Sequence, residues 1–285
     1  MDTLILAKHI GCPDPGTSVR VGETTCKSII NRSGIKGVDY AVNPYIGCGH
    51  GCIYCYARFM TRWYHPGERW GSFVDVKKNA LECMRREAGS RPPGVILFSS
   101  VTDAYQPLER KTGLTRSLLE VLAEHDYPVE VLTKSSLVVR DMDILGRFDQ
   151  AEVGLTLTAM DDGARRVFEP GASTVQERLN ALKTFSDQGI DTYAFLGPLL
   201  PYISEDRLEE LLNALADRVG KVIVDRLNIK AGNWAPIRDA LEDHYPDLLP
   251  RIKEASAEES PYYDALKVKV VGMLDRRVIP ADVVY

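Results

Sequence analysis

Short apolar runs and amphipathic stretches alternate along the middle of the chain. The apolar runs, which are typical of buried strands, cover residues 39–42, 94–98, 129–132, 153–157, 192–196 and 222–227. Between them, apolar residues recur every three or four positions, the period of an amphipathic helix. Because parallel strands need a long crossover that a helix provides, this alternation predicts an α/β fold with parallel strands. Ligands of such folds bind at the carboxyl ends of the strands.

The N-terminal part of the chain lacks this alternation. Residues 1–38 carry scattered glycines and prolines without a sustained period, so we expect an irregular N-terminal arm. Cys12 and Cys26 in this arm have no further Cys or His at metal-ligand spacing, and we interpret them as ordinary thiols. Residues 74–87 have the apolar spacing of a helix, with Cys83 in the core.

The alternation also weakens towards the C-terminus. Residues 254–261 are predicted to form a loop, whereas residues 265–271 alternate loosely and are predicted to form a strand. We therefore divide the chain into an N-terminal arm over residues 1–38, a core over residues 39–240 and a C-terminal extension over residues 241–285.

Composition is that of an ordinary soluble globular protein, with 45% apolar and 26% charged residues. The net charge of −5 does not indicate a nucleic-acid-binding protein, but a local basic groove is compatible with an overall negative charge. A nucleic-acid partner is therefore neither supported nor excluded. No apolar run is long enough to span a bilayer, and the first residues do not have the pattern of a signal peptide. We expect a cytoplasmic protein without a membrane partner.

Three of the six cysteines lie within one glycine-rich stretch, as Cys48, Cys52 and Cys55 in a C-x3-C-x2-C pattern. Three thiolates can bind three irons of a cubane iron–sulfur cluster and leave the fourth iron without a cysteine. A structural zinc loop is the alternative, but it normally needs a fourth Cys or His. His50 lies inside the stretch, and we interpret it as a loop side chain rather than a ligand.

This cysteine stretch with its flanks, Asn43-Pro44-Tyr45 before it and Tyr54-Cys55-Tyr56-Ala57 at its end, resembles the spore photoproduct lyase-like branch of the radical S-adenosylmethionine (SAM) superfamily. Supporting similarities, in the same order as in that branch, lie at residues 99–109, 132–135 and 168–171. The resemblance implies a partial (β/α)6 TIM-like barrel, a 4Fe-4S cluster and SAM. It also implies an external one-electron donor such as a flavodoxin or ferredoxin.

Within this resemblance, Cys48, Cys52 and Cys55 are the cluster ligands. The residues implied at SAM are Tyr54, Ser99, Ser100, Thr102, Asp103, Lys134, Thr156 and Arg178. Tyr54 stands where members of the superfamily carry an aromatic beside the adenine, and the turn at residues 99–103 would meet the amino group of SAM. Lys134 and Thr156 would reach the SAM carboxylate and ribose.

Several of these residues have an alternative role that the sequence leaves open. Asp103 can cap the next helix, Lys134 can be a solvated lysine at a strand end, and Arg178 can pair with Glu169 instead of meeting the SAM carboxylate. Tyr56 is the candidate hydrogen donor or relay, with a packed aromatic as its alternative. Weaker candidates are the possible general bases Glu109, Glu169 and Asp225 and the substrate-facing residues Asn228, Lys230, Asn233 and Trp234.

One departure from the branch bears on the reaction. Spore photoproduct lyase uses a cysteine after its second strand as a hydrogen-atom donor, and Ser100 stands at that position here. An alkoxyl O–H bond is far stronger than a thiol S–H bond, so a serine does not replace that cysteine. We therefore expect an enzyme that cleaves SAM to a 5′-deoxyadenosyl radical, which abstracts hydrogen from an unidentified small-molecule or nucleic-acid substrate. The alternatives are a thymine-dimer lyase, which Ser100 disfavours, and a non-catalytic iron–sulfur or zinc-binding protein.

Overall fold

The computed structural model describes residues 8–11, 18–229, 232–257 and 259–285. It has two compact units, of which the first comprises Met1–Gly51 and Ala57–Ala151 and the second Cys52–Tyr56 and Glu152–Tyr285. The chain therefore passes from the first unit to the second inside the cysteine stretch. Cys12 and Lys230, both interpreted from the sequence, lie outside the described residues. Within the described ranges, no helix is both long and apolar enough to cross a bilayer.

The first unit contains two groups of strands. One has the order β1-β2-β6-β5, formed by Lys8–Gly11, Ser18–Thr24, Phe73–Lys77 and Tyr45–Gly47. The other has the order β8-β7-β4-β3, formed by Val129–Thr133, Ile96–Phe98, Tyr40–Val42 and Ile30–Arg32. β7 pairs in parallel with both β4 and β8, and β3 pairs antiparallel with β4. The carboxyl ends of β4, β7 and β8 therefore meet at one edge, where the polar loops of the unit begin.

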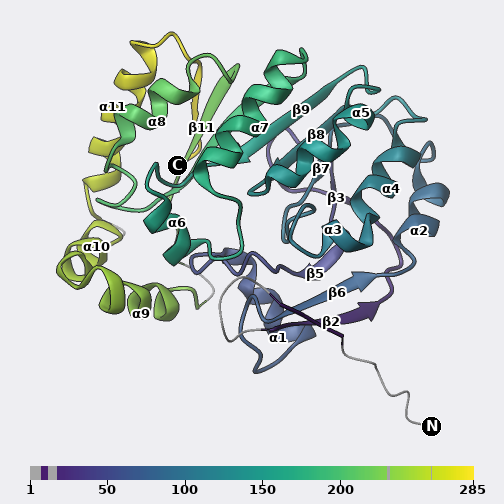
Figure 1. The fold of residues 1–285 in the computed structure, drawn as a ribbon, viewed down its shortest axis with the longest axis horizontal. Coiled ribbons are helices and arrows are strands. Elements are labelled where there is room, and N and C mark those ends of the chain that lie inside the picture. The colour runs from purple at the N-terminus through teal and green to yellow at the C-terminus, as the bar shows by residue number, and fades with distance from the viewer. Residues whose placement is uncertain (1–7, 12–17, 230–231, 258) are drawn as a thin grey trace. The chain divides into compact units, whose positions relative to one another are not determined.

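Helices follow the strands of the first unit along the chain (Figure 1). α4 (Leu114–Leu122) completely buries Leu118, Leu119 and Leu122, which have the predicted helical spacing. α2 (Ala80–Glu87) lies beside α4. The remaining helical segments are η1 (Tyr56–Met60), α1 (Thr61–Tyr64), α3 (Glu109–Thr112), η2 (Ser136–Asp141) and α5 (Met142–Leu145).

The second unit is built on parallel strands in the order β12-β11-β10-β9. These strands are Ala281–Val283, Lys221–Arg226, Asp191–Leu199 and Ala151–Thr156. Its helices are α6 (Asp162–Phe168), α7 (Val175–Asp187), α8 (Leu208–Leu215), α9 (Trp234–His244), η3 (Pro246–Leu248), α10 (Leu249–Ala255) and α11 (Tyr262–Asp275). α7 begins with a capping box, in which Thr174 and Glu177 each accept a hydrogen bond from the other's backbone N–H.

The predicted α/β class is confirmed, and each apolar run in the middle of the chain forms a strand. These strands are β4, β7, β8, β9, β10 and β11. Their neighbours within each unit are parallel apart from β3, because helical crossovers connect them. The three-part division of the chain at residues 38 and 240 stays a prediction.

The expectation of an irregular arm over residues 1–38 is wrong for the described part of that region. β2 pairs in parallel with β6, and β3 pairs with β4. These strands are stabilised by partners that lie farther along the chain, so their own residues show no clear period.

Two further segments differ from expectation. The first four residues of the helix expected at residues 74–87 belong to β6, where they pair with β2 and β5, and α2 begins only at Ala80. The strand expected at residues 265–271 is instead part of α11. The buried residues of α11 are Tyr263, Leu266, Val270, Met273 and Leu274. Their helical spacing shows that packing of one helix face overrides the local preference of the valines for a strand.

Gly154 on β9 offers a test of the packing in the second unit. A Cβ at this position would lie 2.2 Å from Cζ of Tyr193, which is its register partner on β10. We expect Gly154→Ala to lower the free energy of unfolding by about 1–3 kcal/mol, because the buried ring must shift. Urea unfolding measures the change.

The matched control is Gly272→Ala on α11, where nothing lies within 4 Å of the added Cβ. Alanine favours a helix over glycine, so this variant should be neutral or more stable. Equal stability of the two variants would contradict the packing of Tyr193 on Gly154.

Candidate active site

The cysteine stretch begins directly after β5, where the chain turns at Gly47. Gly47 has φ +82°, and a Cβ there would lie 2.5 Å from the carbonyl oxygen of Phe73, so only glycine fits. Gly51 also has a positive φ of +61°, and its N–H donates to the carbonyl oxygen of Cys48 at 3.2 Å. Cys48 therefore lies in a tight turn whose shape depends on the glycines on both sides.

Side chains from the loop after β7 hold this turn. Gln106 is fully buried, and its Oε1 accepts the N–H of Gly49 at 2.6 Å, while its Nε2 donates to Thr102 Oγ1 at 3.1 Å. Thr102 Oγ1 in turn donates to the carbonyl oxygen of Gly47 at 2.6 Å. The backbone on both sides of Cys48 is thus fixed by two side chains. The sequence predicts no role for Gln106, because nothing local connects it to a glycine 57 residues earlier.

Asn43, which directly follows β4, holds the turn after β7. Its Oδ1 accepts the N–H groups of Ser100 and Val101, each at 3.0 Å, and its Nδ2 donates to Ser100 Oγ at 3.0 Å. Ser99 lies in the left-handed region with φ +84°, and its Oγ accepts the N–H of Ala104 at 2.5 Å. Both serines therefore make bonds within the protein that shape this turn.

Asp103 is a buried carboxylate in the same turn. It accepts hydrogen bonds from Thr133 Oγ1 at 2.7 Å, Lys134 N at 3.0 Å and Tyr105 N at 2.9 Å. Nδ1 of the buried His50 lies 3.2 Å from Asp103 Oδ2, within ion-pair distance but without the angle of a hydrogen bond. Burial alone would raise the Asp103 pKa, but the neighbouring His50 and the donated hydrogen bonds hold this pKa well below its ordinary value. Asp103 therefore connects the turn to β8 and to the cysteine stretch.

The second unit holds the segment that carries Cys52 and Cys55, and Tyr54 anchors it. The buried Tyr54 hydroxyl donates to Glu169 Oε1 and lies 3.2 Å from Thr158 Oγ1. Thr158 Oγ1 also donates to Glu169 Oε1, at 2.6 Å. Burial and the neighbouring Glu169 charge raise the pKa of Tyr54, so its phenol stays protonated and remains a donor.

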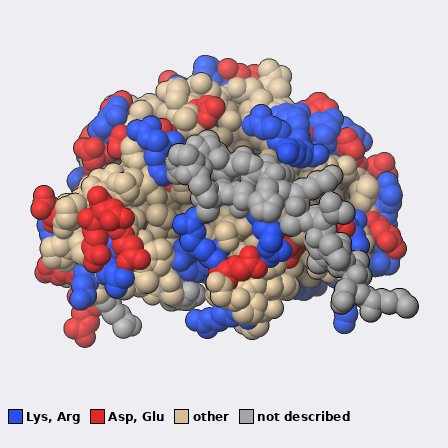
Figure 2. All heavy atoms as spheres, turned by 60° about the horizontal axis from the view of Figure 1, so that its bottom comes forward, with Lys and Arg blue, Asp and Glu red and all other residues tan. Residues whose placement is uncertain are grey.

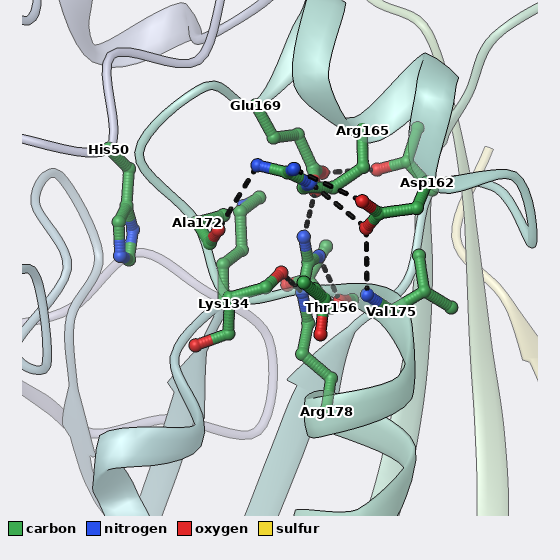
Figure 3. A network of polar contacts seen from close by, with 12 residues as sticks. His50, Lys134, Thr156, Asp162, Arg165, Glu169, Ala172, Val175 and Arg178 are labelled. Carbon is green, nitrogen blue, oxygen red and sulfur yellow. Dashed lines mark hydrogen bonds and ion pairs between the residues drawn. The ribbon is translucent and has the colours of Figure 1, made fainter. Parts of the chain in front are cut away.

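Arg178 supplies the positive charge opposite Glu169 (Figure 3). Its Nη2 donates to Glu169 Oε2 at 2.5 Å, its Nη1 to the carbonyl oxygen of Thr156 at 2.8 Å, and its Nε to the carbonyl oxygen of Ser173 at 2.8 Å. Both members of the ion pair are buried. Of the two roles left open for Arg178, the structure shows the pairing with Glu169.

A second arginine orders the loop between α6 and α7 (Figure 3). Arg165 Nε pairs with Asp162 Oδ1 at 3.0 Å, and Nη1 reaches the carbonyl oxygens of Pro170 and Ala172 at 3.3 and 3.4 Å. Asp162 Oδ1 also accepts the N–H of Val175, the first residue of α7, at 3.2 Å. The contacts of Arg165 and Asp162 therefore fix the loop that carries the buried carboxylate of Glu169.

Backbone groups of the cysteine stretch are also bound in the second unit. The N–H of Ile53 donates to the carbonyl oxygen of Phe168 at 2.9 Å. Asn233 is fully buried, and its Nδ2 donates to the carbonyl oxygens of Tyr54 at 2.9 Å and Asn228 at 3.0 Å. The role that the structure shows for Asn233 is to hold the segment between two of the cysteines.

The candidate residues thus fall into two sets, one in each unit. The first set consists of Cys48, Ser99, Ser100, Thr102, Asp103 and Lys134. The second set consists of Cys52, Tyr54, Cys55, Tyr56, Thr156 and Arg178. Thr156 is buried at the carboxyl end of β9, whereas Tyr56 is 51% exposed. Contacts of these residues with SAM stay predictions.

The cysteines suit a cluster by the chemistry of their donors. Cys48 and Cys52 are buried, and Cys55 is partly exposed. Among the described residues, no three Cys, His, Asp or Glu side chains converge so as to hold a single metal ion. In a cubane each thiolate binds a different iron, so its ligands need not converge on one point. Three cysteines in one glycine-rich stretch supply the donor set that a 4Fe-4S cluster with one open iron requires.

The sequence model of the Radical SAM superfamily matches residues 42–215, which is more than half of the chain. The chain belongs to the radical SAM superfamily. An uncharacterized protein of Methanocaldococcus jannaschii is 35% identical over 241 residues, which cover 85% of this chain and 90% of the archaeal protein. A radical SAM Nalpha-GlyT isomerase of Pseudomonas phage M6 is 29% identical over 197 residues, 68% of this chain and 40% of the phage protein.

The fold of this radical SAM protein is similar to that of spore photoproduct lyase. A mutant of that lyase with bound AdoMet and dinucleoside spore photoproduct superposes with a TM-score of 0.67 at 17% identity, over 93% of this chain and 81% of the lyase. This likeness of fold confirms the predicted class, a partial (β/α)6 barrel. Superfamily membership further implies a 4Fe-4S cluster and SAM.

Gln106→Leu tests whether the braced turn matters for the cluster. The variant leaves the N–H of Gly49 without its buried acceptor, which costs about 1–3 kcal/mol. We expect the iron and sulfide content after anaerobic reconstitution to fall by at least roughly half, with circular dichroism unchanged. Gln176→Leu on the exposed face of α7 is the control. Full iron content in Gln106→Leu would contradict the role of the brace.

Arg178→Met tests the buried ion pair. Removing one partner leaves Glu169 charged and buried, so we expect the free energy of unfolding to fall by about 3–5 kcal/mol. Adding Glu169→Gln should restore part of this loss in a double-mutant cycle followed by urea unfolding. Arg166→Met is the control, because Arg166 pairs with Asp162 while 67% exposed and should cost about 0–1 kcal/mol. Equal costs for the two arginines would contradict the assignment.

Proposed function

We propose that this protein is a radical SAM enzyme that binds a 4Fe-4S cluster through Cys48, Cys52 and Cys55. Such a cluster supplies an electron and an open iron at which SAM is cleaved to methionine and a 5′-deoxyadenosyl radical, which abstracts hydrogen from an organic substrate. The observation that carries the proposal is the superfamily match over residues 42–215, which includes all three cysteines.

Side chains of the protein hold the backbone of the cysteine stretch in position. Gln106 and Thr102 bond the backbone on both sides of Cys48, and Asn233 bonds the carbonyl oxygen of Tyr54 between the other two cysteines. Ligands held by the protein's own hydrogen bonds need little rearrangement when iron binds. These hydrogen bonds support an ordered backbone beside Cys48 and at Tyr54.

The residues proposed at SAM differ in how many of their polar groups the protein already uses. Three nitrogens of Arg178 donate to protein oxygens, which favours a positioning role and leaves the SAM carboxylate to Lys134. We assign the ribose to Thr156 and the adenine to the ring of Tyr54, whose hydroxyl is fixed by Glu169. Fixing the hydroxyl restricts the orientation of the ring.

The turn at residues 99–103 is our proposed partner of the SAM amino group. Its serines and Asp103 are engaged in hydrogen bonds to the protein, so they shape the turn and its carbonyl groups. Carbonyl oxygens are acceptors for an ammonium group. We further propose that a flavodoxin or ferredoxin supplies the electron and that the half-exposed Tyr56 acts as hydrogen donor or relay.

A nucleic-acid lesion is the second candidate substrate, favoured by the likeness of fold to a lyase solved with a dinucleoside photoproduct. Two observations weigh against it. Ser100, which accepts a hydrogen bond from Asn43, offers an O–H in place of the donor thiol of that lyase. The net charge is −5, and Figure 2 shows Lys and Arg side chains interspersed with Asp and Glu on the face that it displays. We therefore favour a different hydrogen abstraction.

The proposal predicts that the reconstituted protein forms 5′-deoxyadenosine from SAM when dithionite is added without oxygen. Cys52→Ala should form none, because the cluster loses a ligand, whereas Cys26→Ala should form as much as the wild type. Chromatography of the nucleoside product measures both. If wild-type protein with a full cluster formed no 5′-deoxyadenosine, this result would contradict the enzyme assignment and favour a non-catalytic iron–sulfur protein.

The same assay with dinucleoside spore photoproduct separates the two substrate classes. We expect SAM cleavage without release of thymine monomers. Efficient repair by the chain with Ser100 would overturn our preference for a different substrate.

A further inference from the structure

Two cysteines outside the cysteine stretch lie side by side in the first unit. Cys26 follows β2, and Cys83 lies on α2, 57 residues later. Their Sγ atoms are 3.9 Å apart, and both are free thiols. Cys83 is buried, whereas Cys26 is partly exposed between the exposed residues Thr25 and Lys27. Cys26 is therefore the more accessible residue of the pair, and the sulfur of the buried Cys83 lies in contact with its sulfur.

Asn79 holds the two cysteines together. Its Oδ1 accepts the N–H of Cys26 at 2.9 Å, and its Nδ2 donates to the carbonyl oxygen of Cys26 at 2.8 Å. The same Nδ2 lies 3.5 Å from the Sγ of Cys83, which is one helical turn later. Cys83 Sγ also donates to the carbonyl oxygen of Cys26 at 3.5 Å. These contacts fix the backbone of one cysteine against the side chain of the other.

The rest of the segment is bound along the same face of α2. Arg86 Nη2 donates to the carbonyl oxygen of Lys27 at 2.8 Å. Glu87 Oε2 accepts from Ser28 Oγ at 2.7 Å and from the N–H groups of Ile29 and Ile30 at 3.2 and 3.0 Å. Because the segment is held at several successive residues, the separation of the two sulfurs is set by the fold and not by chance contact.

We propose that Cys26 and Cys83 are a disulfide-forming pair that closes reversibly when the protein meets a low-molecular-weight disulfide. An S–S bond requires the sulfurs to approach to about 2.05 Å, a shift of about 2 Å from their present separation. The loop closed in this way contains the whole cysteine stretch. The disulfide would tether both ends of the cluster-bearing segment without using a cluster ligand.

Thiol–disulfide exchange would form the Cys26–Cys83 bond in two steps. The Cys26 thiolate attacks a sulfur of the oxidant disulfide, forms a mixed disulfide and releases one thiolate. The Cys83 thiolate then attacks Cys26 Sγ, forms the intramolecular bond and releases the second thiolate. The two protons of the protein thiols pass to the two released thiolates. The protein is oxidised by two electrons, and the oxidant disulfide is reduced to two thiols.

The surroundings of the pair make this exchange slow at neutral pH. Burial and the neighbouring Cys83 raise the pKa of Cys26 to about 11, so little thiolate is present at pH 7. As long as the pH is below that pKa, the thiolate fraction rises about tenfold for each unit by which the pH increases. The pair therefore suits a response to sustained oxidation rather than a rapid sensor.

The test uses full-length protein with its cluster, prepared without oxygen and incubated with oxidised glutathione. After thiols are blocked with N-ethylmaleimide, digestion without reductant and mass spectrometry identify linked peptides. We expect a link between Cys26 and Cys83 and a loss of two hydrogens in mass. We also expect a rise in Tm of roughly 5–10 °C that dithiothreitol reverses, because closing a long loop restricts the unfolded chain.

Matched variants decide the assignment. Cys26→Ser and Cys83→Ser should lose both the link and the rise in Tm, whereas Cys12→Ser, which removes a thiol elsewhere in the chain, should keep them. The rate of linkage in the wild type should increase about tenfold from pH 7 to pH 8. Absence of the link in cluster-loaded wild-type protein, or a link from Cys26 to any other cysteine, would overturn the proposal.

Discussion

A buried backbone needs hydrogen-bond partners, and the cysteine stretch has no regular structure to provide them. Several of its polar groups bond instead to side chains and to a carbonyl group elsewhere in the chain. Gln106 accepts from Gly49, and Asn233 donates to the carbonyl oxygen of Tyr54. Because the stretch passes from one compact unit to the other, each unit supplies its own partners. The conformation of the cysteine stretch therefore depends on residues distant from it in sequence.

Two buried carboxylates have comparable roles in the two units. Asp103 in the first unit accepts three hydrogen bonds and lies beside His50, while Glu169 in the second unit binds Tyr54, Thr158 and Arg178. A buried charge is tolerated when donors or an opposite charge surround it, and it then fixes the groups that donate to it. Both carboxylates are committed to organising loops, which argues against a part for either as a general base.

Superfamily membership carries the functional proposal further than the fold does, since similar folds support different reactions. Superfamily membership implies a 4Fe-4S cluster and SAM. The sequence predicts that Ser100 distinguishes this protein from the lyase whose fold it resembles, and this correspondence stays a prediction. Asn43 holds this serine by hydrogen bonds as part of a turn, so its observed role is structural.

The sequence alone determined the spacing of Cys48, Cys52 and Cys55 and the strands of the core, because both are carried by residues close together in the chain. It also marked the turn at residues 99–103 and the alternatives for Arg178. Only the tertiary structure decided the roles of Gln106 and Asn43, the pairing of β2 with β6, and the contact of Cys26 with Cys83. Each of these depends on partners dozens of residues apart, so no local period or spacing reveals them. The helix at residues 262–275 shows the same limit, because packing of one face decided against the strand that its valines favour locally.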